Sequence, residues 1–236
     1  MRSSSSEADL LDPGPSGFAH RGLHHTPTTI ENSAAAFTAA LKLGAGIECD
    51  LRLTADDQII VFHDAEARGL CGSSETIGRS TLAGLAHLAV GGHPIPTLAQ
   101  TLALVAGRVP ILLEAKVDGD ANRFARALAR ELDAYTGPFG VMSFHPGLLV
   151  MLKAHASHIR RGLVIRDSLS TAKRWAAMKL ADPAFLAVDL AAIDRPWVAR
   201  ARTHLPVYTW TVRTGADRAR ALAKADALIW EADGRP

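Results

Sequence analysis

The chain has 236 residues, of which 48% are hydrophobic and 21% are charged, a composition typical of a soluble globular protein with one large hydrophobic core. Its formal net charge of +2 at pH 7 is too small to indicate binding to nucleic acid or to an acidic membrane surface. No apolar run approaches the roughly 20 residues of a membrane-spanning helix. We therefore expect neither nucleic acid nor an integral membrane association among its partners.

Residues 1–16 lack the apolar stretch of a secretory signal and are predicted to form a flexible leader. Residues 17–236 contain no segment that resembles a linker, which predicts a single domain. The two cysteines, Cys49 and Cys71, form neither a CxxC pair nor a disulfide framework. This cysteine usage favours a cytoplasmic location.

Short runs of β-branched and other apolar residues alternate with longer stretches of helical character. We predict strands at 17–20, 46–53, 58–63, 111–116, 139–144, 161–165, 185–190, 207–212 and 227–230. We predict helices at 32–44, 97–107, 121–134, 146–156, 168–179, 195–204 and 215–225. The predicted helix caps are Asn32, Thr97, Ser168 and Thr214 at the amino ends and Gly44 and Gly107 at the carboxyl ends. Such alternation is typical of parallel βαβ units.

The second and third predicted strands cannot be parallel neighbours. Only the four residues 54–57 separate them, whereas a parallel crossover needs a dozen residues or more. They are therefore predicted to form an antiparallel hairpin that prolongs the second strand and returns to His63. Setting the return strand aside leaves eight parallel strands, the number in a TIM (β/α)8 barrel. The sequence thus predicts this α/β fold with a β-hairpin extension after strand two.

TIM barrels carry their chemistry at the carboxyl ends of their strands, and charged residues gather there in this sequence. They are His20 and Arg21 after the first strand, Glu48 and Asp50 in the second, His63 after the hairpin, and Glu114 and Lys116 at the end of the next strand. Residues two apart in a strand share a face. Glu48 and Asp50 are therefore expected on one face of their strand, and Glu114 and Lys116 on one face of theirs. Burying this set without a ligand or metal would cost several kcal/mol per unpaired charge.

The carboxylates of Glu48, Asp50 and Glu114 offer only hard oxygen ligands. This choice favours Mg²⁺ or Ca²⁺ over zinc, so we expect a divalent cation of this class as cofactor. Arg21 and Lys116 are side chains that bind phosphate, the first as a planar fork and the second as a point charge.

The imidazoles of His20 and His63 suit the roles of general base and general acid. An acid and a base on opposite sides of one phosphorus suit a phosphodiester better than a monoester. The residues together indicate metal-assisted attack on a phosphodiester.

With these residues placed, the sequence resembles the glycerophosphodiester phosphodiesterase family from His20 to about Glu231. The family motifs occur in order: HRG at 20–22, EN at 31–32, ECD at 48–50, FHD at 62–64, IPTL at 95–98, EAK at 114–116, SF at 143–144 and WTV at 210–212. Each motif alone is common, but the ordered set is specific.

The resemblance implies a TIM barrel that hydrolyses small glycerophosphodiesters to an alcohol and sn-glycerol 3-phosphate. It implies a catalytic pair (His20, His63), a cation site (Glu48, Asp50, Glu114), a phosphate site (Arg21, Lys116) and an aromatic residue on the glycerol side (Trp210). The role of Trp210 rests on the resemblance alone. Attack by the glycerol hydroxyl, through a cyclic phosphate, and direct attack by water both stay open.

The sequence departs from the family pattern at a few positions. Ile30 stands before EN where proline is usual, and Arg213 follows WTV where asparagine is typical. Trp230 and Glu231 close the last strand where threonine and aspartate would be expected. These changes bear on the substrate pocket rather than on the chemistry.

The chain leaves no room for a helix after its last strand. We therefore expect one flank of the barrel to lack its helix and to be covered by the leader or by a second subunit in a homodimer. Two alternative functions stay open. Lysophospholipase D-like cleavage would be favoured by an exposed apolar patch beside the barrel mouth, whereas a non-catalytic phosphate-binding barrel is disfavoured by the presence of both histidines and all three carboxylates.

Overall fold

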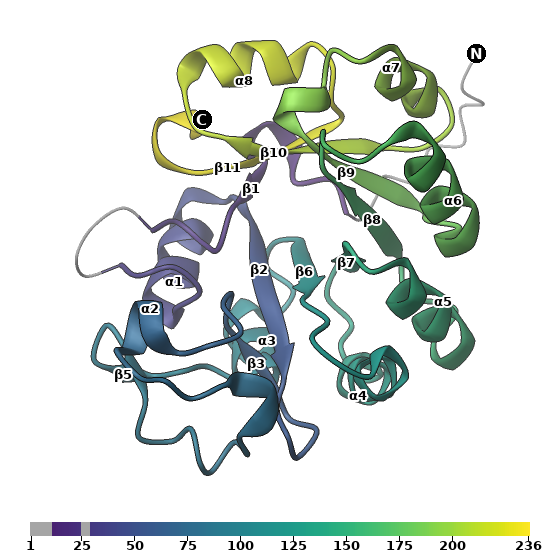
Figure 1. The fold of residues 1–236 in the computed structure, drawn as a ribbon. Helices are drawn as coiled ribbons and strands as arrows, with labels where there is room; N and C mark the ends of the chain where they lie inside the picture. The colour runs from purple at the N-terminus through teal and green to yellow at the C-terminus, as the bar shows by residue number, and fades with distance from the viewer. Residues whose placement is uncertain (1–10, 25–28) are drawn as a thin grey trace.

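The computed structural model of the chain describes residues 11–24 and 29–236. Eight parallel strands follow one another in the order β1-β11-β10-β9-β8-β7-β6-β2, and pairing of β1 with β2 closes them into a barrel (Figure 1). They are β1 (Phe18–Ala19), β2 (Gly46–Leu53), β6 (Ile111–Ala115), β7 (Phe139–Ser143), β8 (Arg161–Ile165), β9 (Phe185–Asp189), β10 (Val207–Val212) and β11 (Ala227–Trp230). The predicted TIM barrel is confirmed.

Helices surround the barrel, with α4 to α8 on one side and α1 and α3 on the other (Figure 1). They are α1 (Ala34–Leu43), α3 (Leu98–Val105), α4 (Ala121–Leu132), α5 (Pro146–His155), α6 (Thr171–Ala181), α7 (Pro196–Arg202) and α8 (Gly215–Leu222). Thr97 and Thr214 cap α3 and α8 as predicted, and Gly44 ends α1. The amino-terminal caps of α1 and α6 are Ser33 and Ser170, not Asn32 and Ser168, and α3 ends at Ala106, not Gly107.

The predicted hairpin is present between β2 and β3 (Ile59–Val61), with Leu51 opposite Val61. The amide of Phe62 donates to the carbonyl of Asp50 at 2.9 Å, so the chain after β3 returns to the level of the acidic residues in β2. The segment between β3 and α3 then forms a protrusion that contains α2 (Arg68–Cys71), η2 (Ile77–Arg79), β4 (Ala89–Val90) and β5 (His93–Pro94). It packs around its own small apolar cluster.

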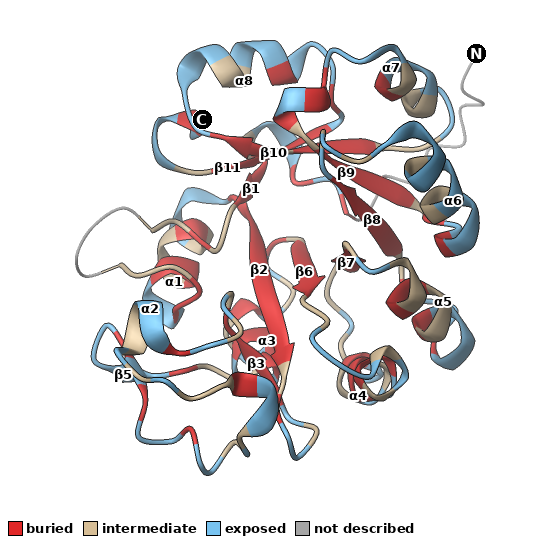
Figure 2. Ribbon diagram, viewed as in Figure 1, coloured by how far each residue is buried: buried red, intermediate tan, exposed pale blue. Residues whose placement is uncertain are grey.

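The buried residues form one layer inside the barrel and a larger one between the strands and the helices (Figure 2). The inner layer is aromatic: Phe18, Phe185 and Tyr208 stack with ring centres 5.0–5.8 Å apart. Gly162 makes room for them, because a Cβ there would lie 2.2 Å from the Phe185 ring. The barrel interior is therefore filled below the site, and its chemistry is confined to the rim.

Residues 11–16, which we expected to belong to the flexible leader, pack against the barrel instead. Leu11 is 2% exposed and belongs to the inner layer, where it contacts the position of Gly140. A 3-10 turn, η1 (Gly14–Ser16), then leads into β1. The rest of the predicted leader, residues 1–10, lies outside the described residues. Hydrophobic burial of Leu11 is what fixes this segment.

At the flank after the last strand, Pro15 and Ser16 of the predicted leader contact the described chain, in line with one of the two covers that we expected there. Trp230 is fully buried in the outer layer, and its indole N–H donates to the carbonyl of Ser16 at 2.6 Å. A short 3-10 turn, η4 (Ala232–Gly234), follows. The Arg218 guanidinium joins the two chain segments by donating to the carbonyls of Gly234 and Pro15. A buried indole thus ties the last strand to the segment before β1.

Candidate active site

Three buried carboxylates lie together at the carboxyl ends of β2 and β6. Glu48 and Asp50 point to the same side of β2, while Cys49 between them points into the outer apolar layer. Glu114 on β6 lies directly opposite Asp50 in the strand register. One oxygen from each carboxylate lies within 4.8 Å of the others. Strand alternation and register therefore build this acidic cluster.

Two cations border the acidic cluster. The Arg21 backbone N–H donates to Glu48 Oε2 and its Nε lies 3.0 Å from Asp50 Oδ2. The Lys116 ammonium lies 3.0 Å from Asp50 Oδ1 and also pairs with Glu114. Arg21 adopts a positive φ of 56°, and the next residue, Gly22, leaves no space for a Cβ against Ala36. The turn at HRG thus points a guanidinium back at the carboxylates.

The pKa values of the three carboxyls are shifted in different directions, upward by burial and mutual repulsion and downward where neighbouring cations dominate. Burial, with the neighbouring Asp50 charge, raises the pKa of Glu48 to about 8, and burial also raises the pKa of Glu114. Burial acts in the same direction on Asp50, but Lys116 and Arg21 outweigh it and lower the pKa of that carboxyl to about 2. The cluster holds more carboxylate than its two cations stabilise.

The donor atoms of the cluster fit a hard divalent cation. Glu48 Oε1 is buried and has no hydrogen-bond partner among the described residues, and the corresponding oxygens of Asp50 and Glu114 meet only the ammonium of Lys116. Unsatisfied buried oxygens of this kind are costly. Carboxylate oxygens converging from two strands are the ligands that Mg²⁺ and Ca²⁺ prefer. The residues present therefore fit the predicted cofactor class.

Asn32 supports the cluster instead of capping a helix as predicted. Its amide N–H donates to Asp50 Oδ2 at 2.9 Å, and its carbonyl oxygen accepts from the Asp50 backbone N–H at 3.2 Å. The residue is buried and has a φ of 56°, a conformation that asparagine tolerates better than most residues. Ser33 takes over the cap. Asn32 therefore fixes both the position and the orientation of the Asp50 carboxylate.

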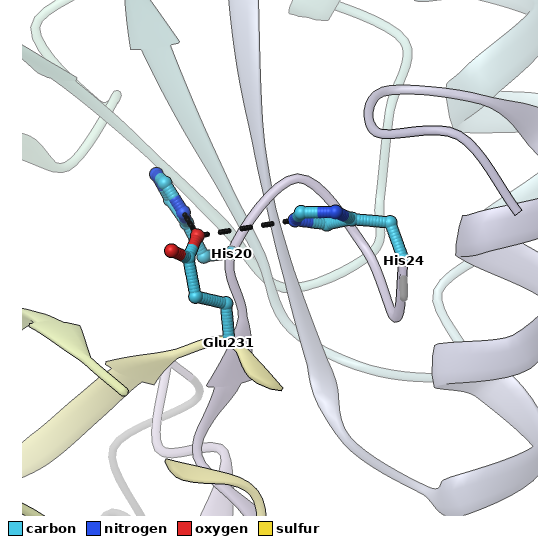
Figure 3. A group of neighbouring side chains, drawn as sticks. All are labelled: His20, His24 and Glu231. Carbon is cyan, nitrogen blue, oxygen red and sulfur yellow. Dashed lines mark hydrogen bonds and ion pairs between the residues drawn. The ribbon is translucent and has the colours of Figure 1, made fainter. Parts of the chain in front are cut away.

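Figure 3 shows Glu231 between His20 and His24. The His20 Nδ1 lies 2.6 Å from Glu231 Oε2, while His24 Nε2 lies 3.9 Å from the same oxygen. The other ring nitrogen of His20 points toward the acidic cluster, with Nε2 4.0 Å from Glu48 Oε2. Arg213 binds the second oxygen of Glu231 at 2.6 Å. Glu231 therefore connects the first histidine to a cation on the neighbouring strand.

These contacts set the charges around His20. Burial alone would lower the pKa of His20, but the hydrogen bond to Glu231 and the charge of Glu48 outweigh burial and raise it. The same hydrogen bond lowers the pKa of Glu231 to about 2. Burial lowers the pKa of His24, which lacks such a close partner. Of the two histidines beside Glu231, His20 is therefore the one held in a proton-accepting environment.

His63 has a similar arrangement on the hairpin side. Its Nδ1 lies 2.7 Å from Asp64 Oδ1, and its backbone carbonyl accepts from Arg52 Nε at 2.7 Å. Arg52 is itself fixed by an ion pair with Asp118. A neutral imidazole that donates from Nδ1 keeps its lone pair on Nε2. Both predicted catalytic histidines thus have a carboxylate on Nδ1.

Trp210 forms an aromatic wall near Lys116. Its indole N–H donates to the carbonyl of Ala187, and its ring meets Phe144 edge to face at 5.5 Å. The Phe144 ring centre lies 5.7 Å from the Lys116 ammonium. The structure thus brings the eight residues singled out from the sequence to one end of the barrel.

Sequence reasoning missed the supporting residues Asn32, Asp64 and Glu231. Glu231 directly follows the last strand, in the position where a TIM barrel presents functional groups, and this signal could have identified it. Asp64 adjoins a predicted site histidine. For Asn32 the EN motif at 31–32 was a signal, but a polar residue just before a helix is more often a cap, and that interpretation was preferred.

The chain is similar to known proteins in sequence and in fold. The model of the Glycerophosphoryl diester phosphodiesterase family matches residues 20–230. A glycerophosphodiester phosphodiesterase of Caldanaerobacter subterraneus is 33% identical over 99 residues, which cover 38% of this chain and 40% of that protein. One from Bacillus altitudinis is 27% identical over 164 residues, or 64% and 66% of the two chains. The chain thus matches less than half of the first relative's length and about two thirds of the second's.

The fold also matches a solved structure over most of its length. The phosphodiesterase of Oleispira antarctica, solved in complex with its product sn-glycerol-3-phosphate, superposes with a TM-score of 0.81. The alignment covers 92% of each chain at 22% identity. At this identity the likeness concerns the fold.

Proposed function

The chain belongs to the glycerophosphoryl diester phosphodiesterase family, and from this membership and the site we propose that it hydrolyses glycerophosphodiesters to an alcohol and sn-glycerol 3-phosphate. The single observation that carries the proposal is the acidic cluster bordered by Arg21, Lys116 and two carboxylate-bound histidines. The product complex of the Oleispira relative supports the same product class.

The substrate phosphate binds between Arg21 and Lys116 in this proposal. Arg21 and Lys116 follow the carboxyl ends of β1 and β6, the two strands that flank β2, and both side chains reach the acidic cluster. Charge-assisted hydrogen bonds from them orient a phosphodiester beside the cluster. Glu48, Asp50 and Glu114 hold the divalent cation, with Asn32 fixing Asp50. When bound, such a cation polarises phosphoryl oxygens and offsets negative charge. Mg²⁺ and Ca²⁺ are both compatible with this ligand set.

His20 and His63 transfer the protons. One accepts the proton of the attacking hydroxyl, and the other donates a proton to the leaving oxygen, so that the alcohol departs uncharged. The attacking group is the neighbouring glycerol hydroxyl or a water molecule. Direct attack by water needs these two proton transfers once, whereas attack by the hydroxyl forms a cyclic phosphate that water then opens with a second pair of transfers. Glu231 and Asp64 orient the imidazoles through Nδ1 and leave Nε2 for the substrate.

The lysophospholipid alternative lacks the feature that would favour it. The large apolar side chains exposed in the described part of the chain are Leu43, Trp175, Leu180 and Leu222. They lie on the outer helices α1, α6 and α8. No helix within the described residues is both long enough and apolar enough to cross a membrane. Small, deacylated headgroup esters are therefore the proposed substrates.

The decisive experiment measures glycerol 3-phosphate release from glycerophosphocholine and glycerophosphoethanolamine, before and after EDTA, with Mg²⁺ or Ca²⁺ added back. We expect EDTA to abolish release and one cation to restore it. A His20→Ala variant should lose about a hundredfold or more in kcat. Unchanged turnover in that variant would refute the proton-transfer role of His20, and absence of release under every cation would favour the non-catalytic phosphate-binding barrel.

A further inference from the structure

A pocket of about 430 Å³ adjoins the phosphate site at the carboxyl ends of β6, β7 and β8. It is termed here the Arg166 pocket and is lined by Arg52, Ala115, Lys116, Val117, Asp118, Ser143, Phe144, His145 and Arg166. Lys116, Phe144 and Arg166 directly follow three successive barrel strands. Lys116 also contacts the acidic cluster, so the pocket is continuous with the proposed phosphate site.

The wall of the pocket is a cation stacked on an aromatic ring. The Arg166 guanidinium carbon lies 4.5 Å from the centre of the Phe144 ring, and Phe144 is in turn held edge to face by Trp210. Stacking on a ring restrains the guanidinium without using its N–H donors. Arg166 is exposed and has no carboxylate partner among the described residues. Its donors are therefore available to a ligand.

The other charges of the pocket already have partners. Arg52 forms an ion pair with Asp118. Lys116 serves the acidic cluster and, with Arg21, the scissile phosphate of the proposed substrate. Arg166 is therefore the cation of this pocket that has no carboxylate partner among the described residues. A pocket with a surplus positive charge attracts anions and disfavours a cationic group such as a quaternary ammonium.

His145 adds a second donor to the same wall. Its Nδ1 accepts from the backbone N–H of Leu148 at 3.1 Å, so a neutral ring carries its proton on Nε2. His145 is also the amino-terminal cap of the ten-residue helix α5. The positive end of the helix dipole therefore begins beside the pocket.

We propose that the Arg166 pocket binds a second anionic group of the substrate, a phosphate or carboxylate, next to the scissile phosphate. The inference rests on the proposed hydrolysis of glycerophosphodiesters and narrows its substrate class to doubly anionic esters. The second anion can belong to the glycerol or to the leaving alcohol, since the pocket recognises the same chemistry in either place. Choline esters are then the poorer substrates.

A binding experiment tests the pocket without turnover. Calorimetry compares glycerol 3-phosphate with glycerol 1,3-bisphosphate on the whole protein, its Arg166→Ala variant and the control Arg126→Ala, which removes an exposed arginine of α4 outside the pocket. We expect the bisphosphate to bind about tenfold or more tightly than the monophosphate, as one charge-assisted hydrogen bond allows. Arg166→Ala should remove this preference, Arg166→Lys should retain part of it, and Arg126→Ala should leave it unchanged.

A turnover experiment tests whether the second anion can be carried by the leaving alcohol. It compares kcat/KM for glycerophosphoglycerol, its terminal phosphate ester and glycerophosphocholine in the same four proteins. A preference for the phosphate ester that Arg166→Ala removes selectively supports the pocket, as does the bisphosphate preference in binding. The proposed anion pocket is overturned if neither experiment shows a preference for the doubly anionic ligand. It is also overturned if Arg166→Ala weakens binding or turnover equally for all ligands. Absence of turnover with an intact, Arg166-dependent binding preference would refute the proposed hydrolysis and leave the anion pocket standing.

Discussion

The carboxylate of Glu231 has a cationic partner on each of its oxygens, His20 on one and Arg213 on the other. With a pKa of about 2 it is ionised throughout the range in which hydrolases work. A permanently charged acceptor orients the imidazole and favours its protonated form. The partner of the proposed acid–base residue therefore comes from the opposite end of the chain.

Replacing Glu231 by Gln tests this role through pH. Glu231 raises the pKa of His20 against burial, which lowers it. Removing the charge therefore lets the His20 pKa fall, and the limb of the pH–rate profile that reports His20 should move to lower pH, with a reduced kcat. The measurement is kcat against pH for both proteins. An unshifted limb would contradict the assignment, and Asp217→Asn, at another carboxylate near Arg213, is the control.

Replacing Asn32 by Gly removes the amide that fixes Asp50 while preserving a residue that tolerates positive φ. Loss of a supporting hydrogen bond to a metal ligand typically weakens metal binding about 10–100-fold. We expect a weakening of this size in calorimetric titration with Mg²⁺ or Ca²⁺. Thr38→Gly, at a half-buried position of α1, should bind the cation as the parent does.

At this scale the sequence predicted which side chains gather but not what holds them. The eight predicted residues lie at strand ends, and strand periodicity alone places such residues on one rim. Asn32 was misread because its partner, Asp50, is 18 residues away and a local capping role explained it equally well. The catalytic, binding and metal roles of the eight predicted residues stay predictions.

Among the elements, the hairpin of β2 and β3 shows most clearly why the strands were predictable. A connection too short for a crossover leaves only the antiparallel pairing, so the length of the loop between the two strands decided the topology. The two-residue strands β4 and β5 were missed, because elements this short carry no periodicity. The burial of Trp230 in the outer layer was also not predicted, because its contact with Ser16 joins residues 214 apart.

The packing of β8 against β9 supplies an element-scale prediction. A methyl group added at Gly162 would meet the Phe185 ring inside a filled barrel. Overpacking of this kind typically costs about 1–3 kcal/mol, so Gly162→Ala should lower the free energy of unfolding by that amount in urea denaturation. The matched control is Gly119→Ala, where a Cβ meets no atom within 4 Å and φ is not positive. Equal stability of the two variants would contradict the packing account.

For the molecule as a whole, the acidic cluster couples stability to pH and to cation. The pKa of Glu48 is about 8 in the folded protein against an ordinary 4.5. The folded state therefore binds more protons than the unfolded state between these values, and stability of the metal-free protein falls as pH rises through this window.

Cation binding should reverse this loss. A ligand that binds only the folded protein stabilises it by about 2.7 kcal/mol at a hundred times its Kd, so Mg²⁺ or Ca²⁺ should raise the Tm at pH 8 and less at pH 5. Glu48→Gln removes both a repelling charge and a ligand oxygen. It should abolish the cation-dependent rise in thermal denaturation without lowering the metal-free Tm. A rise of unchanged size in that variant would place the cation elsewhere.

The pairing of β1 with β11 has a consequence for synthesis. The amide of His20 donates to the carbonyl of Trp230, and its imidazole meets Glu231, 211 residues further along. At roughly 5–20 residues per second, a ribosome needs on the order of 10–40 s to make the intervening chain. During that time the first histidine has neither its neighbouring strand nor its carboxylate. The proposed catalytic arrangement should therefore form as one late event, when β11 emerges and closes the ring.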